Sequence, residues 1–219
     1  MVNVPELRVH EKALAWNVPP GWRALSSAAV GGGLTEPAWV VNVDVGGGFA
    51  RTDLSVWAGE MAARLGLRGE GCALLTAADV TQVETAEADG VVAWSTVGVT
   101  RPTWALDPRD PVEDPPRPGT VNIVVAVPAP LSTSALVQAV GTITEAKAQV
   151  LVQAGVPGTG TASDAVVVLS PAPAADEVVF AGVRSPWGQR IARAVHASVA
   201  AGLASHPWPA DDVDPTVVW

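Results

Sequence analysis

Side chains that could orient or cleave a polar substrate are concentrated in residues 119–169. This segment reads GTVN at 119–122, TEAK at 144–147 and GTGTASD at 158–164. GTVN and GTGTASD each open a strand-like apolar run, and TEAK lies on the long helix expected between them. A packed core does not need so many hydroxyl, amide and charged groups at the ends of its elements. The pattern therefore indicates a pocket that binds a polar substrate.

Three ionisable residues of this segment are candidates for acid–base chemistry. Lys147 falls on the apolar face of the helix, where a lysine either extends from the edge of the core into solvent or meets a carboxylate or substrate in a pocket. Glu145 lies about 200° around the helix axis from Lys147, so the two are not expected to form a close pair. Asp164 precedes an apolar strand and is either an Asx-turn residue or a functional carboxylate.

The glycine-rich loop at 158–164 is typical of a backbone that approaches a ligand closely. Thr159, Thr161 and Ser163 add hydroxyl groups to its backbone N–H donors. The phosphate-binding patterns G-x-x-x-x-G-K-[ST] and G-x-G-x-x-G after a strand are absent. We therefore expect these three residues, together with Asn122, to bind a polar group of the substrate.

Ser26 and Ser27 offer a second, covalent chemistry. They lie between a strand-like WRAL segment and the glycine run at 31–33, whose backbone N–H groups could form an oxyanion hole. The G-x-S-x-G elbow is absent, so the alternative is that the two serines simply end a strand. In the covalent mechanism one serine is the nucleophile and Lys147 is its base.

The histidines and the cysteine argue against metal-dependent and histidine-based catalysis. His10, His196 and His206 are widely separated, and neither H-E-x-x-H nor a Cys/His ligand spacing occurs. Cys72 lies among apolar residues and is interpreted as a small buried core residue. We expect no metal site and no cofactor.

The composition limits the classes of partner. The 219 residues carry a formal charge of −9, and their 13 lysines and arginines form no basic run. Nucleic acid and anionic membranes are therefore not expected partners, because both bind clustered basic residues. No apolar run approaches the roughly 18 residues of a membrane span. The N-terminus has no secretion signal, so the expected location is the cytoplasm.

Nine tryptophans accompany two phenylalanines and no tyrosine. This composition indicates either ordinary use of indole rings in the core or a large flat ligand that packs against them.

The hydrophobic pattern predicts an α+β fold with a mixed or antiparallel sheet covered by layers of helix. In the first half we expect a strand at 37–45, a helix capped by Thr52 and ended by Gly66, and a hairpin of strands 80–88 and 91–99 around Asp89-Gly90. In the second half we expect a strand at 120–127, a helix from Ser132 to about residue 154, strands at 165–169 and 178–181, and a helix from Ser185-Pro186.

The second half repeats the order of elements in the first, which suggests two pseudo-symmetric β-α-β-β halves. Asn42 takes the place of Asn122, and TAAD at 76–79 takes the place of TASD at 161–164. A site near the pseudo-twofold axis would then also include Asn42 and Asp79. The expected organisation is one domain at 1–205 with halves at 25–101 and 119–205, a proline-rich connector at 102–118 and an acidic, proline-rich tail at 206–219.

Taken in order, the motifs resemble those of the adenosylcobinamide amidohydrolase family. The resemblance rests on LSSA at 25–28, VVNV at 40–43, TAAD, GTVN, TEAK, GTGTASD and AGxxxPxG at 181–188. It departs from the family where Ala162 and Ser163 replace the usual Gly and Thr of a TGTGTD motif. The resemblance implies hydrolysis of the amide that joins aminopropanol to the corrinoid, releasing adenosylcobyric acid for cobalamin assembly. The cobalt corrinoid is then the substrate, not a cofactor.

The resemblance leaves the catalytic roles open. Either Asp164 or Glu145 is expected to activate water, while Asn122 and the loop at 159–161 hold the amide oxygen and Lys147 orients or charges the carboxylate. A corrinoid-binding or trafficking protein without chemistry is the main alternative, and a nucleotide-binding module is a weaker one. The motifs do not set the oligomeric state, and a homo-oligomer is one option. They also do not decide whether the substrate needs its adenosyl ligand or whether complete cobamides are cleaved.

Overall fold

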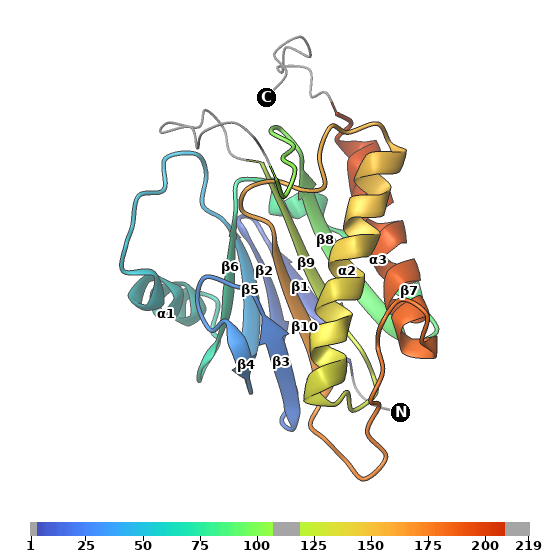
Figure 1. Ribbon diagram of the computed structural model, residues 1–219. Helices are drawn as coiled ribbons and strands as arrows, with labels where there is room; N and C mark the ends of the chain where they lie inside the picture. Colours follow the sequence, from blue (N-terminus) through green and yellow to red (C-terminus); the bar gives the residue numbers. More distant parts are fainter. Residues whose placement is uncertain (1–3, 107–118, 209–219) are drawn as a thin grey trace.

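The protein folds into four layers (Figure 1). The computed structural model describes residues 4–106 and 119–208. Helix α1 covers one face of a four-stranded sheet, and a six-stranded sheet packs against the other face. Helices α2 and α3 cover the outer face of the six-stranded sheet. The arrangement confirms the predicted α+β class with mixed sheets and helix layers.

The helices are α1 (Leu54–Arg64), α2 (Thr133–Gln153) and α3 (Pro186–Ser205), with a short 3₁₀ helix, η1 (Val80–Gln82). The strands of the smaller sheet are, in spatial order, β1 (Leu7–His10), β2 (Ala13–Asn17), β5 (Trp39–Asp44) and β6 (Gly71–Thr76). Those of the larger sheet are β4 (Gly33–Thr35), β3 (Trp22–Ser26), β10 (Ala165–Pro171), β9 (Thr120–Ala126), β8 (Val91–Gly98) and β7 (Glu84–Ala88).

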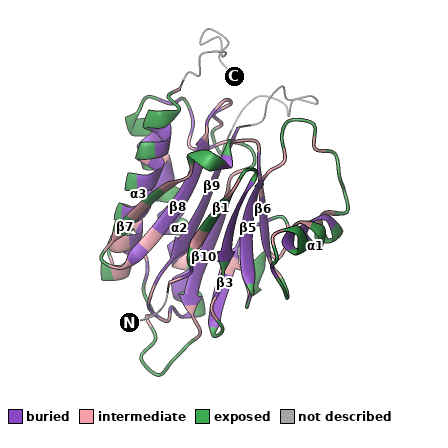
Figure 2. Ribbon diagram, turned by 180° about the vertical axis from the view of Figure 1, so that it is seen from behind, coloured by how far each residue is buried: buried purple, intermediate pink, exposed green. Residues whose placement is uncertain are grey.

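The central strands are buried on both faces because each sheet is covered on both sides. All seven residues of β9 are buried and alternate between two cores. Val124 and Ala126 belong to the core between the sheets, whereas Ile123 and Val125 belong to the core under α2 and α3. Figure 2 shows this burial along the middle of the sheets.

Core packing accounts for most of the indole rings. Five tryptophans are buried: Trp16, Trp22, Trp39, Trp57 and Trp94. Trp16 and Trp94 meet edge to face between the two sheets, with ring centroids 5.7 Å apart. Cys72 is also fully buried, and burial raises the pKa of its thiol, which confirms its interpretation as a small core residue.

Local sequence signals set the helix ends. Ser132 and Ser185 cap α2 and α3 as predicted, since their hydroxyls accept hydrogen bonds from the backbone N–H groups of Ala135 at 3.1 Å and Gly188 at 3.0 Å. The predicted cap of α1 is wrong by one residue. Asp53 occupies that position, and its carboxylate binds Arg51 at 2.5 Å and does not bond the helix N-terminus.

The Asp89-Gly90 hairpin is confirmed. Both residues have positive φ, 48° and 87°, as a tight two-residue turn between twisted strands requires. The first strand of the hairpin begins later than predicted, at Glu84, because Val80–Gln82 forms η1.

The two halves agree only in part. A parallel strand pair joined through a helix occurs in both, as β5-α1-β6 and β9-α2-β10. The predicted strand at 178–181 is wrong, since Val178 forms a single bridge to Leu131. The reason is that β10 pairs with β9 on one side and with β3 on the other, so the strand that follows β10 in the sequence cannot pair with it. TAAD follows β6 whereas TASD precedes β10, so these motifs are not equivalent.

Most of the predicted connector and tail, at 107–118 and 209–219, lies outside the described residues. Within the described part of the chain, no helix has the length and apolar character that crossing a bilayer requires.

Candidate active site

A buried ion pair links α2 to the start of β10. The Nζ atom of Lys147 lies 2.5 Å from Oδ2 of Asp164, and the two side chains are only 9% and 11% exposed. Lys147 points inward because it continues the apolar stripe of α2, in which Ile143 and Leu151 are fully buried. Of the two arrangements that the sequence allowed for Lys147, the structure shows the contact with a carboxylate.

Asp164 engages both of its carboxylate oxygens. Oδ1 accepts hydrogen bonds from the backbone N–H of Val121 at 2.8 Å and from the hydroxyl of Thr161 at 2.5 Å. Oδ2 accepts from the backbone N–H of Thr161 at 3.1 Å, in addition to Lys147. Asp164 therefore closes the loop as a turn residue and also neutralises a buried ammonium. Four donors occupy about as many lone pairs as a carboxylate has, so little capacity remains to accept a proton from water.

The glycines of this loop are required by contacts within the protein. A Cβ atom on Gly160 would lie 2.3 Å from Oδ2 of Asp164 and 2.6 Å from Nζ of Lys147. A Cβ atom on Gly158 would lie 2.7 Å from the backbone nitrogen of Thr103. The sequence suggested that these glycines let the backbone approach a ligand, but in the structure they let it close over the ion pair and residue 103.

Gly160→Ala is therefore expected to push Lys147 and Asp164 apart and to lower the free energy of unfolding by about 1–3 kcal/mol. Urea denaturation measures the change. Gly59→Ala is the matched control, since nothing lies within 4 Å of a Cβ atom at that exposed position of α1. The control should stabilise the protein by up to about 1 kcal/mol. Equal effects of the two substitutions would contradict the packing argument.

A depression of about 550 Å³ borders the ion pair. Three segments form its walls: Gly141, Thr144, Glu145, Lys147 and Ala148 of α2, then Thr159, Gly160 and Thr161, then Thr103, Trp104 and Ala105. Glu145 is exposed and borders the depression from the solvent side of α2, whereas Lys147 is buried. The predicted absence of a Glu145–Lys147 pair holds, because Lys147 binds Asp164.

Thr159 and Thr161 line the depression, but Ser163 does not. The Oγ atom of Ser163 lies 2.7 Å from Oγ1 of Thr120 and also donates to the backbone oxygen of Gly119 at 3.2 Å. Ser163 thus fastens the loop to the start of β9, and its predicted contact with the substrate stays a prediction.

Asn42 and Asn122 come together, but not at the depression. The amide nitrogen of Asn122 donates to Oδ1 of Asn42 at 2.9 Å and to the backbone oxygen of Leu75 at 3.0 Å. Asn42 in turn donates to the hydroxyl of Thr96 at 3.0 Å. Both asparagines are at most 2% exposed and join the two sheets. The side chain of Asn122 thus extends toward the other sheet whereas Lys147 lies on α2, and its contact with a substrate amide stays a prediction.

Asp79 has a local structural role. Its carboxylate caps η1 by accepting hydrogen bonds from the hydroxyl of Thr81 at 2.7 Å and from its backbone N–H at 2.9 Å. These bonds hold the pKa of Asp79 below its usual value. Asp79 does not line this depression, and its predicted place in a site stays a prediction.

Ser26 and Ser27 also lie outside the depression. The hydroxyl of Ser26 accepts a hydrogen bond from the backbone N–H of Ala28 at 2.9 Å, and that of Ser27 accepts from Val166 at 3.0 Å. Gly31 packs so closely on β6 that a Cβ atom there would lie 2.3 Å from the backbone oxygen of Gly71. These contacts match the strand-end alternative for the two serines.

Two residues that line the depression beside Lys147 were not predicted from the sequence. Thr144 belongs to a motif that was identified, but Thr103 and Trp104 lie in the segment interpreted as a connector. A single tryptophan among prolines and charged residues was the available signal.

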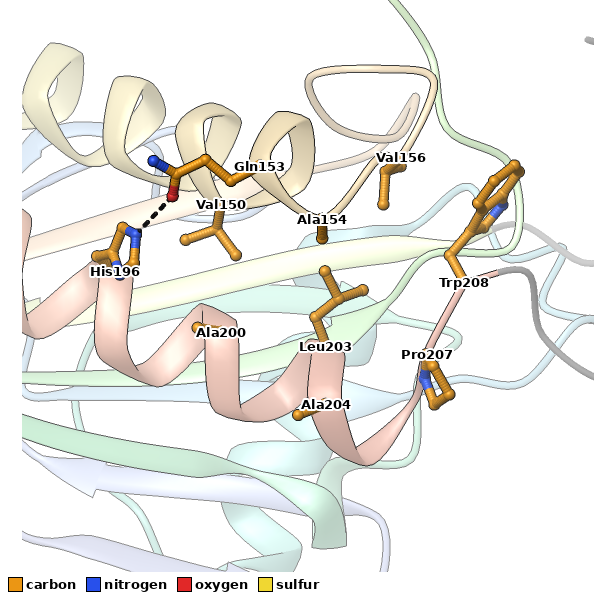
Figure 3. Close-up of a pocket in the computed structure, with 10 residues that line it drawn as sticks. All are labelled: Val150, Gln153, Ala154, Val156, His196, Ala200, Leu203, Ala204, Pro207 and Trp208. Carbon is orange, nitrogen blue, oxygen red and sulfur yellow. Dashed lines mark hydrogen bonds between the residues drawn. The ribbon is translucent and has the colours of Figure 1, made fainter.

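A second depression, of about 380 Å³, lies between the C-terminal ends of α2 and α3 (Figure 3). Its walls are mainly apolar, with Val150, Leu203 and Trp208 among them. The one hydrogen bond drawn between its residues joins His196 to Gln153 at 3.1 Å. This arrangement lacks the carboxylate and ammonium that the first depression combines.

The first depression brings together one exposed carboxylate, one buried ammonium and several threonine hydroxyls. Such groups can take up a proton, stabilise a developing negative charge and orient a polar substrate. Across residues 4–106 and 119–208, no group of three or more His, Cys, Asp or Glu side chains is placed to hold a metal ion.

Comparison with known proteins agrees with this chemistry. The profile of the adenosylcobinamide amidohydrolase family matches residues 2–208. An adenosylcobinamide amidohydrolase from Methanosarcina mazei is 29% identical over 185 residues, which cover 81% of this chain and 88% of that protein. One from Halobacterium salinarum is 35% identical over 145 residues, which cover 63% of this chain and 61% of that protein.

A solved structure, the PH0078 protein from Pyrococcus horikoshii OT3, is similar with a TM-score of 0.42 and 11% identity, covering 91% of this chain and 79% of that chain. The sequence relatives, not this structure, define the class, which is that of enzymes hydrolysing an amide C–N bond. The chain belongs to the adenosylcobinamide amidohydrolase family.

Proposed function

We propose that this protein hydrolyses the amide bond of adenosylcobinamide, releasing adenosylcobyric acid and aminopropanol for corrinoid salvage and cobalamin biosynthesis. The observation that best supports the proposal is the buried Lys147–Asp164 pair beside a depression that also carries the carboxylate of Glu145. The corrinoid is the substrate, water is the second reactant, and the cytoplasm remains the expected location.

Glu145 is the better placed of the two candidate bases. Its carboxylate is exposed at the depression, whereas that of Asp164 already accepts four hydrogen bonds. In the proposed step, water attacks the amide carbon and Glu145 takes a proton from it. The C–N bond then breaks, and the proton passes to the nitrogen of the departing aminopropanol. The corrinoid keeps the new carboxyl group.

Lys147 stabilises the negative charge that develops on the amide oxygen. An ammonium has three N–H donors, and among the described residues only Asp164 accepts one from Lys147. The remaining donors are available on the side of the depression that Lys147 lines. Because the ion pair is buried, this stabilisation is stronger than it would be in water. Asp164 acts by holding Lys147 and Thr161 in position.

The charge of the protein also suits this substrate. A net charge of −9 attracts a cationic cobalt corrinoid and disfavours anionic ligands such as nucleotides. The exposed carboxylate of Glu145 places part of that negative charge at the depression itself.

Mass spectrometry of adenosylcobinamide incubated with the purified protein tests the proposal. We expect adenosylcobyric acid and aminopropanol to accumulate in equal amounts. Tight corrinoid binding without product over hours would instead identify a non-catalytic corrinoid-binding protein. The double variant Ser26→Ala/Ser27→Ala should keep its turnover, and a folded but inactive double variant would move the mechanism to the covalent route.

A further inference from the structure

Trp104 differs from the other tryptophans that the structure describes. Five are buried and two, Trp187 and Trp208, are half-buried, whereas 48% of the surface of Trp104 is exposed. A single exposed apolar side chain is common in proteins. Trp104, however, lines the same depression as Glu145 and Lys147, where the proposed reaction occurs.

The backbone beside Trp104 is fixed to the loop that carries the site. The N–H of Thr103 donates to the backbone oxygen of Gly160 at 2.8 Å, and the N–H of Thr159 donates to the backbone oxygen of Thr103 at 2.9 Å. Gly158 permits this close approach, because a Cβ atom there would collide with Thr103. Two backbone hydrogen bonds therefore hold the chain at Thr103, next to Trp104, against the loop that carries Thr161.

The walls of the depression differ in character. Trp104 is the aromatic residue among the lining residues, whereas Glu145, Thr144, Thr159 and Thr161 carry small or charged polar groups. A ligand that matches both kinds of wall has a large flat conjugated ring and a polar side chain that leaves the edge of the ring. The ring would pack against the indole while the side chain reaches the polar groups.

We infer that Trp104 is the platform on which the macrocycle of the substrate packs, and that it positions the ring so that the side-chain amide enters between Glu145 and Lys147. This inference rests on the proposed function for the identity of the ring. Trp104 is a positioning residue, and the bridge between Thr103 and Gly160 transmits its position to the reacting groups.

Equilibrium dialysis with adenosylcobinamide, followed by the visible absorbance of the corrinoid, tests the inference without requiring turnover. Trp104→Ala should raise the dissociation constant about tenfold. Trp104→Leu, which is apolar but has no aromatic face, should do the same, whereas Trp104→Phe should keep most of the affinity. In steady-state kinetics the loss should appear mainly in KM. Leu106→Ala is the control, since Leu106 is 89% exposed in the same segment but does not line the depression.

The outcomes separate this inference from the proposed function. Product formation by the wild type, with unchanged dissociation constant and KM in Trp104→Ala and Trp104→Leu, would overturn the platform alone. Corrinoid binding that weakens in these variants without any product would support the platform and overturn the hydrolysis. A wild-type protein that binds no adenosylcobinamide would overturn both. Thermal unfolding of each variant checks that the fold is kept, and Trp104→Phe gives a second reading if the smaller side chains unfold the protein.

Discussion

Replacing Asp164 with asparagine should abolish turnover of adenosylcobinamide and lower the free energy of unfolding by about 3–5 kcal/mol. The side chain of Lys147 is 9% exposed, and its ammonium has Asp164 as its hydrogen-bond partner among the described residues. An asparagine supplies no counter-charge, so a buried positive charge is left uncompensated. Product release measured by mass spectrometry and urea denaturation give the two effects separately.

Comparing the stability of Lys147→Met with that of Asp164→Asn shows whether the fold depends on the ion pair or on avoiding an unpaired buried charge. When Lys147 is removed, the carboxylate of Asp164 keeps its hydrogen bonds from Val121 and Thr161. Lys147→Met should therefore destabilise the fold less than Asp164→Asn, although it is equally inactive. The double variant Lys147→Met/Asp164→Asn should regain much of the stability lost in Asp164→Asn and remain inactive. An Asp164→Asn protein as stable as the wild type would contradict this account of the pair.

Features that depend on a few neighbouring residues were predictable. The serine caps of α2 and α3 and the Asp89-Gly90 turn follow from contacts within four residues along the chain. The place of Lys147 on the apolar stripe of its helix followed in the same way, but whether its ammonium extends into solvent or meets a carboxylate did not. Thr52 does not cap α1, since Asp53 occupies the cap position, and the carboxylate of Asp53 binds Arg51, an ion pair that no capping pattern encodes.

The pairing of strands was not predictable in the same way. The division into two sheets depends on contacts between distant segments, such as β3 with β10. Fully buried strands carry no alternation of polar and apolar residues that would assign their faces. The strand expected at 178–181 is absent because β3, from the other end of the sequence, already occupies the free side of β10.

The residue types around the depression were predictable from the sequence, but not the side of the sheet to which each side chain points. GTVN and GTGTASD do lie side by side, because β9 and β10 are parallel neighbours. Successive side chains of a strand point to opposite faces of the sheet. A side chain one position further along the strand therefore lies on the other side of the sheet. The N–H of Val121 binds Asp164, whereas the side chain of the next residue, Asn122, binds Asn42 of the other sheet. Sequence alone identifies the polar strand ends but not which of them meet the depression.

Glu145→Gln is expected to lower kcat by about 10²–10⁴-fold, the usual contribution of a general base. Gln has nearly the same shape but cannot take the proton of the attacking water. Because Glu145 is exposed and not part of the buried ion pair, the free energy of unfolding should change by less than about 0.5 kcal/mol. Single-turnover product formation and urea denaturation measure the two quantities, and KM should change little if ring binding dominates affinity.

Glu177→Gln is the matched control for this substitution. Glu177 is also exposed, it lies outside the depression, and its replacement changes the net charge of −9 by the same single unit. A loss of turnover in Glu145→Gln but not in Glu177→Gln therefore reflects the position of the carboxylate and not the overall charge. If Glu145→Gln keeps full turnover, Glu145 is not the base, and Asp164 becomes the carboxylate candidate despite its four hydrogen bonds. Loss of turnover in Asp164→Asn does not decide this by itself, because that variant also removes the partner of Lys147. If Asp164 is the base, Thr161 offers a path for the proton, because its hydroxyl lies 2.5 Å from Oδ1 of Asp164 and it also lines the depression.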